Sequence, residues 1–209
     1  MPDKCIIFDL DDTLVDSEEL CIRAFYNLVP ELKENFENFL EKNRGIKLAL
    51  IFEDIESLIK RKLSTDFEAR YRYEVKRLFD LYLKPNKGGR AALNTLGYPM
   101  CVASSGPKLK IEHALRVTNL RKFFGDNLFS SYEVGAWKPD PGLFLFAAEK
   151  MGFSPENCVV IEDSTPGVMA ARAANMRVFK YSKHSTGDNE GEVIVFNDMQ
   201  ELSKLIDRI

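Results

Sequence analysis

The sequence predicts an α/β fold in which a Rossmann-like, doubly wound parallel sheet carries an inserted all-helical cap domain. Three observations lead to this prediction. Apolar runs of strand length alternate with amphipathic helical patterns over most of the chain. A long segment after the first run contains helical patterns only. Acidic residues directly follow two of the runs, which is typical of a site at the carboxyl ends of parallel strands.

Short apolar runs, each bounded by polar or turn residues, predict the strands of the sheet. They are continuous and do not alternate with polar residues, which indicates strands that are covered on both faces. These runs are Cys5–Phe8, Met100–Ala103, Cys158–Ile161, Val178–Tyr181 and Val193–Phe196.

Helical patterns separate or follow these strands. Apolar residues recur at intervals of three and four positions within each. The second helix has clear ends, because Asp140 is a typical N-cap, Pro141 suits the first helical position and Gly152 suits the residue after the last turn. The predicted helices are Lys108–Val117, Pro141–Met151, Thr165–Ala174 and Met199–Ile209.

The segment from Ser17 to about Leu83 differs in composition: charged and apolar residues recur in helical periods, and its only glycine is Gly45. It predicts helices over Glu18–Leu28, Glu31–Lys42, Ile46–Lys60 and Asp66–Leu83. We therefore expect residues 1–16 and 84–209 to form the α/β core and residues 17–83 to form the helical cap.

Composition and charge narrow the range of functions that the chain can have. The chain has 209 residues, of which 45% are hydrophobic and 29% charged, and this balance supports a folded core. A formal charge of −3 without a long basic run argues against nucleic-acid binding. The apolar run at the N-terminus is too short for a signal peptide or membrane span, so we expect a cytoplasmic protein without membrane contact. Nothing indicates an obligate protein partner, and the four cysteines are expected to be reduced thiols.

Carboxylates gather where two predicted strands end. Asp9 and Asp11 follow the first strand, and alternate residues of an extended segment point the same way. Glu162 and Asp163 close a second strand. Carboxylates held this close repel one another unless a cation lies between them, and Mg²⁺ prefers such oxygen ligands. The simpler alternative is that these residues cap turns and helices.

Two further stretches suit a phosphate ligand. After the second strand, Ser104, Ser105 and Gly106 precede a predicted helix, so a hydroxyl and backbone N–H groups can donate to phosphate oxygens. Lys138 directly precedes Pro139 and lies three residues before Pro141, so two nearby prolines hold its backbone and it can supply a fixed positive charge. A plain N-cap serine and a surface lysine are the alternatives when each stretch is considered alone.

Taken in this order, the four stretches resemble the haloacid-dehalogenase-like superfamily of phosphatases with a helical cap of the first class, over essentially the whole chain. The resemblance implies that Asp9 is the nucleophile and forms an aspartyl-phosphate. It implies that Asp11 protonates the leaving oxygen and then activates water. Ser104 and Lys138 would bind the transferring phosphoryl group.

The resemblance also implies a magnesium site. Mg²⁺ would be held by Asp9, the main-chain carbonyl of Asp11 and Asp163, with Glu162 in support. The family usually has glycine where Asp12 stands in this sequence.

The cap is expected to contact the substrate. Arg44 and Lys47 flank a glycine between two predicted helices and could face the cleft, although a solvated turn explains them equally well. Arg72 and Lys76 on the next helix are weaker candidates. The expected ligand is a small phosphorylated metabolite. Several stretches resemble bacterial sugar-phosphate phosphatases, in particular those acting on 6-phosphogluconate.

Two rival functions are considered. A β-phosphoglucomutase-like phosphotransferase resembles this chain in all four motifs, but such mutases carry a histidine roughly where Cys21 stands. The only histidines are His113 and His184, and neither is near that position. His113 has no partner at metal-binding spacing and is assigned no chemistry. A phosphorylatable signalling module is less consistent with the sequence, because it lacks a large cap and places its aspartate after a middle strand.

Overall fold

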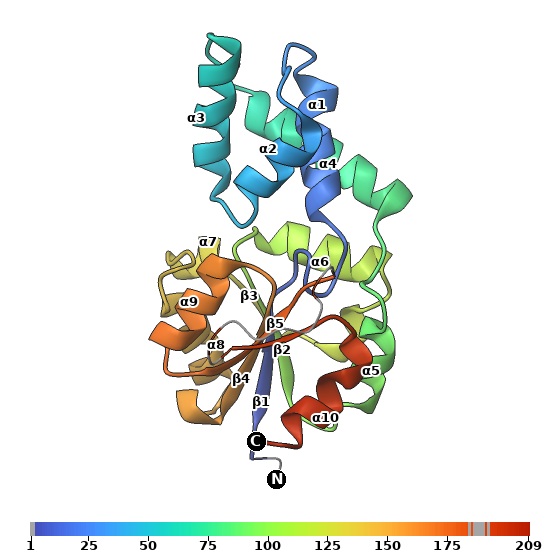
Figure 1. Cartoon of the computed structure of the whole chain (residues 1–209), viewed down its shortest axis with the longest axis vertical. Helices are drawn as coiled ribbons and strands as arrows, with labels where there is room; N and C mark the ends of the chain where they lie inside the picture. Colours follow the sequence, from blue (N-terminus) through green and yellow to red (C-terminus); the bar gives the residue numbers. More distant parts are fainter. Residues whose placement is uncertain (1–2, 184, 186–190, 192) are drawn as a thin grey trace.

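The computed structural model describes residues 3–183, 185, 191 and 193–209. Parallel strands form one six-stranded sheet in the order β3-β2-β1-β4-β5-β6 (Figure 1). The order runs outward from β1 in both directions, which is the doubly wound arrangement. The predicted fold class is therefore confirmed. The strands are β1 (Cys5–Phe8), β2 (Met100–Ser104), β3 (Leu128–Ser130), β4 (Cys158–Glu162), β5 (Arg177–Tyr181) and β6 (Ile194–Phe196).

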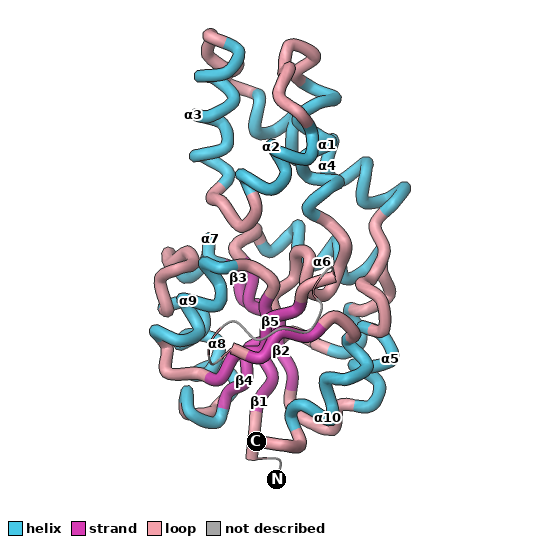
Figure 2. Tube along the Cα trace, in the orientation of Figure 1, coloured by secondary structure: helices cyan, strands magenta, loops and turns pink. Residues whose placement is uncertain are grey.

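Helices cover both faces of the sheet (Figure 2). Along β1, Ile6 and Phe8 pack into one buried cluster, whereas Cys5 and Ile7 pack into the other. This division explains why the strand sequence is apolar at every position, since neither face meets water. The helices of the core are α5 (Gly89–Thr95), α6 (Lys108–Val117), α7 (Ser131–Val134), α8 (Gly142–Met151), α9 (Thr165–Ala173) and α10 (Leu202–Ile206).

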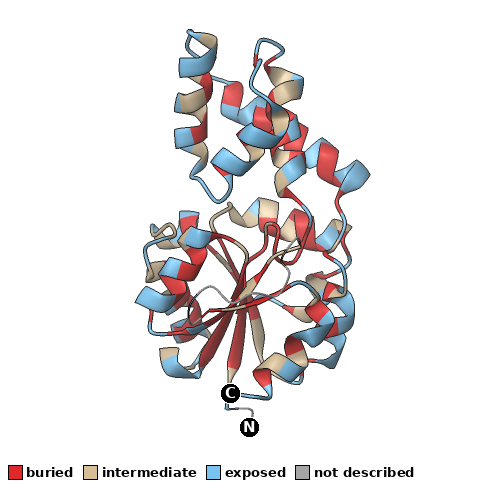
Figure 3. Cartoon of the chain, in the orientation of Figure 1, coloured by how far each residue is buried: buried red, intermediate tan, exposed pale blue. Residues whose placement is uncertain are grey.

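The segment between β1 and α5 forms a separate layer of helices above the sheet (Figure 1). Buried positions recur along these helices (Figure 3), and their apolar residues belong to one hydrophobic cluster. Phe25 stacks on Tyr71 with ring centres 4.3 Å apart, which joins the first and last of these helices. The helices are α1 (Glu18–Leu28), α2 (Phe36–Asn43), α3 (Leu48–Ile59) and α4 (Phe67–Tyr82). The division into domains at residues 17 and 83 stays a prediction.

Several predicted elements differ from those observed. Helix α2 begins at Phe36 and not at Glu31, because the Asn35 side chain accepts a hydrogen bond from the Asn38 N–H and caps the helix there. At the C-terminus, a short 3₁₀ turn over Met199–Glu201 precedes α10, which ends at Ile206.

Strand β3 and helices α5 and α7 were absent from the sequence prediction. Strand β3 spans only Leu128–Ser130, which is too short to stand out as an apolar run. Helix α5 follows Gly88, whose φ of 77° is a left-handed conformation, so a turn-rich sequence conceals the start of the helix.

All four cysteines are free, and three of them are buried in the sheet. Among the described residues, no helix has both the length and the apolar character needed to cross a membrane.

Candidate active site

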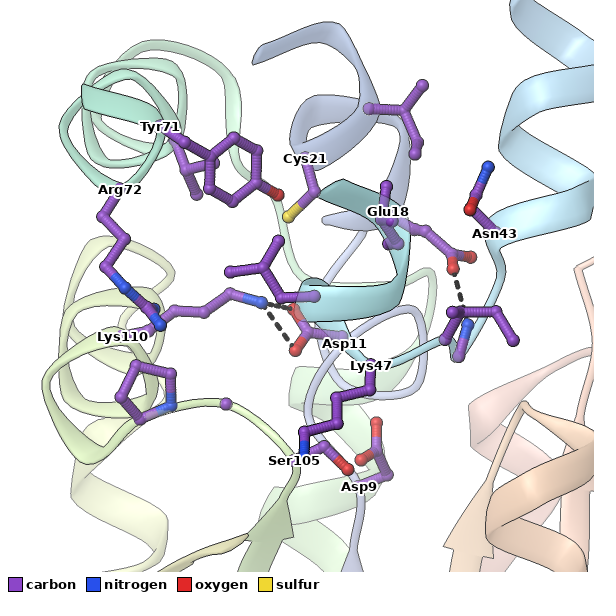
Figure 4. Close-up of a pocket in the computed structure, with 18 of the residues that line it drawn as sticks. Asp9, Asp11, Glu18, Cys21, Asn43, Lys47, Tyr71, Arg72, Ser105 and Lys110 are labelled. Atoms are coloured by element: carbon purple, nitrogen blue, oxygen red, sulfur yellow. Dashed lines mark hydrogen bonds and ion pairs between the residues drawn. The ribbon is translucent and has the colours of Figure 1, made fainter. Parts of the chain in front are cut away.

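A cavity of about 810 Å³ lies between the helical layer and the carboxyl ends of the strands. The core contributes the residues that follow β1, β2 and β4, and the helical layer contributes α1, α4 and the turn before α3. Strands β1 and β4 are adjacent at the centre of the sheet, where the strand order reverses. This is the position where ligands bind in open α/β sheets. Figure 4 shows several of the lining side chains.

Asp9, Lys138 and Glu162 form the buried base of the cavity. The Lys138 ammonium donates to Asp9 Oδ1 at 2.5 Å and to Glu162 Oε1 at 2.6 Å. The three side chains are at most 8% exposed. The second oxygen of Asp9, Oδ2, accepts no hydrogen bond from a described residue. One oxygen of Asp9 is thus held by a cation, and the other is available.

Burial sets the charges of this group. It disfavours the ionised form of Asp9, Lys138 opposes that effect, and Glu162 adds repulsion, so that the pKa of Asp9 is raised to about 8. Burial likewise disfavours the charge of Lys138, but Asp9 and Glu162 together outweigh it and raise the pKa of the lysine. Lys138 therefore stays protonated over the whole physiological range.

Glu162 is anchored and does not point freely into the cavity. Its Oε2 accepts hydrogen bonds from the Ser164 N–H at 2.6 Å and the Ser164 hydroxyl at 2.9 Å. Gly167 makes this position possible, because a Cβ at that residue would overlap the Glu162 carboxylate. Since Lys138 occupies the other oxygen, Glu162 positions the lysine.

Asp163 lies beside this group, and no described cation pairs with its carboxylate. Its Oδ1 accepts a hydrogen bond from the Thr13 hydroxyl at 2.9 Å, and it forms no ion pair with a described residue. Burial, followed by repulsion from Glu162 and Asp9, raises the pKa of Asp163 well above its usual value. One oxygen from each of Asp9, Glu162 and Asp163 lies within 4.8 Å of the others. Such a cluster fits a divalent cation.

The Asp11 carboxylate does not belong to this carboxylate cluster. It accepts a hydrogen bond from the Ser17 hydroxyl at 2.6 Å. It also accepts hydrogen bonds from the Lys110 ammonium at 2.7 and 2.8 Å (Figure 4). Burial favours the neutral acid, but Lys110 and then Ser17 outweigh it and lower the pKa of Asp11. In this conformation Asp11 is therefore a carboxylate.

Lys110 is a site residue that the sequence analysis missed. It belongs to the first turn of α6, and its ammonium lies 5.8 Å from the centre of the Phe79 ring on α4. A cation in the first turn is unfavourable for the helix dipole, which is positive at that end. This misplaced charge is the sequence signal that could have identified Lys110.

Asp12 fills the turn where the family usually has glycine. Its φ of 54° is left-handed, a conformation that aspartate tolerates better than most residues. Its Oδ1 accepts hydrogen bonds from the backbone N–H groups of Ser17 and Glu18, which caps α1. Arg44 and Lys183 lie 3.4 and 3.3 Å from its other oxygen. The additional negative charge is thus compensated locally.

The residues after β2 adopt a tight turn. The Ser104 hydroxyl is buried and accepts a hydrogen bond from the Gly106 N–H at 3.1 Å. Ser105 and Gly106 line the cavity. The turn therefore presents Ser105 and backbone groups to the cavity, while Ser104 holds the turn from below.

The two predicted cations before α3 behave differently. Arg44 is engaged by Asp12 and Glu18, with the Glu18 contact also at 3.4 Å, and it is not among the residues that line the cavity. Lys47 lines the cavity and points toward the part of the core that holds Asp9 and Ser105 (Figure 4). The Lys47 ammonium lies 4.4 Å from the centre of the Trp137 ring. It forms no ion pair with a described residue.

His113, to which the sequence analysis assigned no chemistry, lines the cavity. Its Nε2 lies 3.0 Å from Asp80 and its Nδ1 lies 3.0 Å from Arg116, at the contact between α6 and α4. His184 lies outside the described residues.

Comparison with known proteins assigns the family. A model of haloacid dehalogenase-like hydrolases matches residues 4–175. The chain belongs to the haloacid dehalogenase-like hydrolase family. A 6-phosphogluconate phosphatase of Escherichia coli is 36% identical over 97% of this chain and 94% of its own length. A phosphorylated carbohydrates phosphatase of Thermotoga maritima is 31% identical over 90% of this chain and 88% of its own length.

A solved structure agrees with this assignment. The crystal structure of a haloacid dehalogenase-like protein from Agrobacterium tumefaciens has a TM-score of 0.82 at 29% identity, and the alignment covers 98% of each chain. The match includes the helical insertion as well as the sheet, because it covers nearly the whole chain. The protein is thus an enzyme of the phosphatase type within the haloacid dehalogenase-like family.

Proposed function

We propose that this enzyme hydrolyses a small sugar phosphate, with 6-phosphogluconate as the preferred substrate, through an aspartyl-phosphate on Asp9. The observation that carries the proposal is the buried Asp9 carboxylate, one oxygen of which is held by Lys138 while the other is available. The similarity to a 6-phosphogluconate phosphatase supports the substrate.

In the first transfer, Asp9 Oδ2 attacks phosphorus and the bond from phosphorus to the sugar oxygen breaks. Asp11 donates a proton to the departing oxygen, which leaves as the sugar hydroxyl. Because Asp11 is a carboxylate while Lys110 holds it, the acid step requires Lys110 to be away from Asp11 and Asp11 to carry the proton that it took from water in the preceding turnover. Lys138 stays beside Asp9 and balances charge on the transferring group.

In the second transfer, water attacks the phosphorus of the aspartyl-phosphate and the bond to Asp9 breaks. Asp11, now a carboxylate, takes the proton of that water. Inorganic phosphate leaves and Asp9 returns to its starting form. The pairing of Asp11 with Lys110 and Ser17 suits this base form.

Mg²⁺ is the proposed cofactor. The side chains of Asp9 and Asp163 would hold it together with the main-chain carbonyl of Asp11, while Glu162 supports them through Lys138. The Asp163 carboxylate, with which no described cation pairs, fits this role within the carboxylate cluster. When bound, the ion would supply positive charge opposite the transferring phosphoryl group.

Contacts to the phosphate and sugar are proposed for three residues that line the cavity. Ser105 and Gly106 offer a hydroxyl and a backbone N–H, and Lys47 offers an ammonium that pairs with no described carboxylate. Ser104 and Lys138 would both act on the phosphoryl group. Ser104 would do so indirectly, by stabilising the turn that carries Ser105 and Gly106. We propose that Arg44 acts indirectly, by fixing the turn that carries Lys47 against Asp12 and Glu18.

The mutase alternative is less consistent with this site. Cys21 lines the cavity from α1, near where mutases carry a histidine. Burial raises the pKa of Cys21 to about 12, so the thiol stays neutral and cannot act as a base at physiological pH.

Phosphate release from a panel of sugar phosphates tests the proposed function. We expect the highest kcat/KM for 6-phosphogluconate in the presence of Mg²⁺, and no release after a chelator removes the metal. Glucose 1-phosphate serves as the mutase control, because isomerisation to glucose 6-phosphate without phosphate release would favour a transferase. Absence of phosphate release from every substrate would contradict the proposal.

Without metal, the free energy of unfolding should fall as the pH rises from about 4 to about 8. The pKa of Asp9 is raised to about 8 in the folded protein, mainly by burial, whereas a free aspartate titrates near 3.9. The unfolded chain therefore loses this proton at lower pH, and the folded state loses stability across the window. Mg²⁺ should stabilise the protein more at pH 8 than at pH 5, since it binds ionised carboxylates.

Thermal unfolding with chelator or Mg²⁺ at these two pH values measures the effect. Asp163→Asn is the matched control, because it removes one ionised ligand and should reduce the Mg²⁺ effect at pH 8. A chelated protein whose Tm rises between pH 5 and pH 8 would contradict the prediction.

A further inference from the structure

The cavity has a charge asymmetry that phosphoryl transfer alone does not require. Among the described lining residues, the carboxylates lie at the carboxyl ends of β1 and β4 and at the start of α1. The proposed metal and phosphoryl group bind at these strand ends. The wall formed by α4 and α6 contributes cations, and no carboxylate of these two helices is among the described lining residues. These cations are Arg72, Lys76, Lys110 and Arg116.

Arg72 is the most precisely held of these cations. Its Nε and Nη2 donate to Glu68 Oε1 at 2.9 and 2.6 Å, and Nη2 also donates to the Tyr132 hydroxyl at 3.0 Å. The guanidinium additionally lies 5.5 Å from the centre of the Tyr132 ring. The two N–H groups of Nη1 have no hydrogen-bond acceptor among the described residues. Arg72 therefore has two oriented N–H donors that are available to a ligand.

Compensation of the Arg72 charge is weak. Glu68 is about half exposed, with a side-chain exposure of 53%, and exposed ion pairs contribute little because water screens them. Lys76, one turn further along α4, is paired with Asp80, and Lys110 is paired with Asp11. The Arg72 side chain is 32% exposed, against 56% for Lys76, and Arg116 is exposed, so Arg72 is the cation of this wall that is best placed to bind an additional anion.

The spacing between the strand that carries the nucleophile and the strand before Tyr132, the partner of Arg72, suits a six-carbon substrate. Its partner Tyr132 follows β3, which is two strands away from β1 in the sheet. Neighbouring strands are about 4.8 Å apart, so β3 and β1 are separated by roughly 10 Å. An extended chain of six carbons with bonds of about 1.5 Å, ending in a phosphate ester, has a comparable length.

We propose that Arg72, oriented by Glu68 and Tyr132, binds the carboxylate at the far end of an aldonic acid phosphate while Asp9 reacts with its phosphate. This proposal rests on the proposed phosphatase function and adds the residue that selects a carboxylated substrate. Arginine suits the role because its planar donors match both carboxylate oxygens. Trp137, whose ring lies 5.5 Å from that of Tyr132, extends an aromatic wall along which the sugar carbons can lie.

The test compares 6-phosphogluconate with glucitol 6-phosphate, which has the same six carbons and phosphate but no carboxylate. Wild-type enzyme should have the higher kcat/KM for 6-phosphogluconate. In Arg72→Gln, the ratio of the two kcat/KM values should fall about tenfold or more, because the carboxylated substrate binds more weakly and its KM rises. Arg70→Gln is the matched control, because Arg70 is exposed on the same helix and does not line the cavity.

A second variant guards against a general structural effect. Tyr132→Phe keeps the ring but removes the hydroxyl that holds Arg72, so the ratio should fall by a smaller factor. If Arg72 only joins α4 to α7, both substrates should be affected equally and the ratio should stay constant, which would overturn the proposal. A preference for fructose 1,6-bisphosphate over 6-phosphogluconate would overturn the choice of a carboxylate.

The outcomes separate this proposal from the proposed function. Phosphate release from both six-carbon substrates with equal kcat/KM in the wild type would leave the phosphatase function standing and remove the carboxylate subsite. Failure to release phosphate from any substrate would instead contradict the function itself.

Discussion

Replacing Asp9 with asparagine is expected to lower kcat by at least about 10⁴-fold, the scale of loss seen when a covalent nucleophile is removed. An amide oxygen is a poor nucleophile, and the aspartyl-phosphate cannot form. The fold should remain intact, because asparagine has nearly the same shape and Glu162 continues to hold Lys138. Above pH 8 the variant should be at least as stable as the wild type, since a buried ionised carboxylate has been removed.

Phosphate release and rapid quenching followed by intact mass measurement test this expectation. The wild type should carry a phosphoryl group during turnover, and Asp9→Asn should not. Asp126→Asn is the control, because Asp126 is fully exposed and pairs only with Arg121 among the described residues. Turnover by Asp9→Asn at the rate of the control would remove Asp9 from the mechanism.

Replacing Lys138 with methionine should reduce both activity and stability. The ammonium is the ion-pair partner of two buried carboxylates, and its loss leaves them close together without a cation. Removing one partner of a buried pair costs about 3–5 kcal/mol of unfolding free energy. Loss of the charge beside the reacting group should lower kcat by about 10²-fold to 10³-fold or more.

Chemical denaturation without metal measures the loss of stability. Lowering the pH should restore part of it, because the pKa of Asp9 is raised and its protonation removes the repulsion from Glu162. Lys87→Met is the control, since Lys87 is an exposed lysine. If Lys138→Met had the same unfolding midpoint as this control, the lysine would not stabilise the buried carboxylates.

Local patterns were sufficient to predict most of the fold. Continuous apolar runs identified the strands other than β3, and the bounds of α1 and α6 agree with their predicted helices residue for residue. These successes share a physical cause, because burial on both faces of a strand and on one face of a helix imposes a period on the sequence. Strand β3 and helix α5 were not predicted, because a three-residue strand is too short to show a period and a glycine turn conceals the start of a helix.

Sequence patterns likewise predicted only part of the candidate site. Asp9, Lys138, Glu162 and Asp163 follow strands or adjoin prolines, and the sheet brings them together at one edge. Their catalytic roles stay predictions, as does the role of Lys47. The Asp11 side chain lies with Lys110 and Ser17 and outside the carboxylate cluster, a pairing that the alternation of an extended segment does not reveal.

The parallel sheet, the helical insertion and the family could all be read from the amino-acid sequence, because each leaves a periodic or local motif in the chain. The pairing of cations with anions became visible only in three dimensions. Lys110 meets Asp11 across 99 positions, and Arg72 meets Tyr132 across 60. Long side chains such as these have no local pattern that fixes their partners. Their partners depend on how the helical layer packs over the sheet.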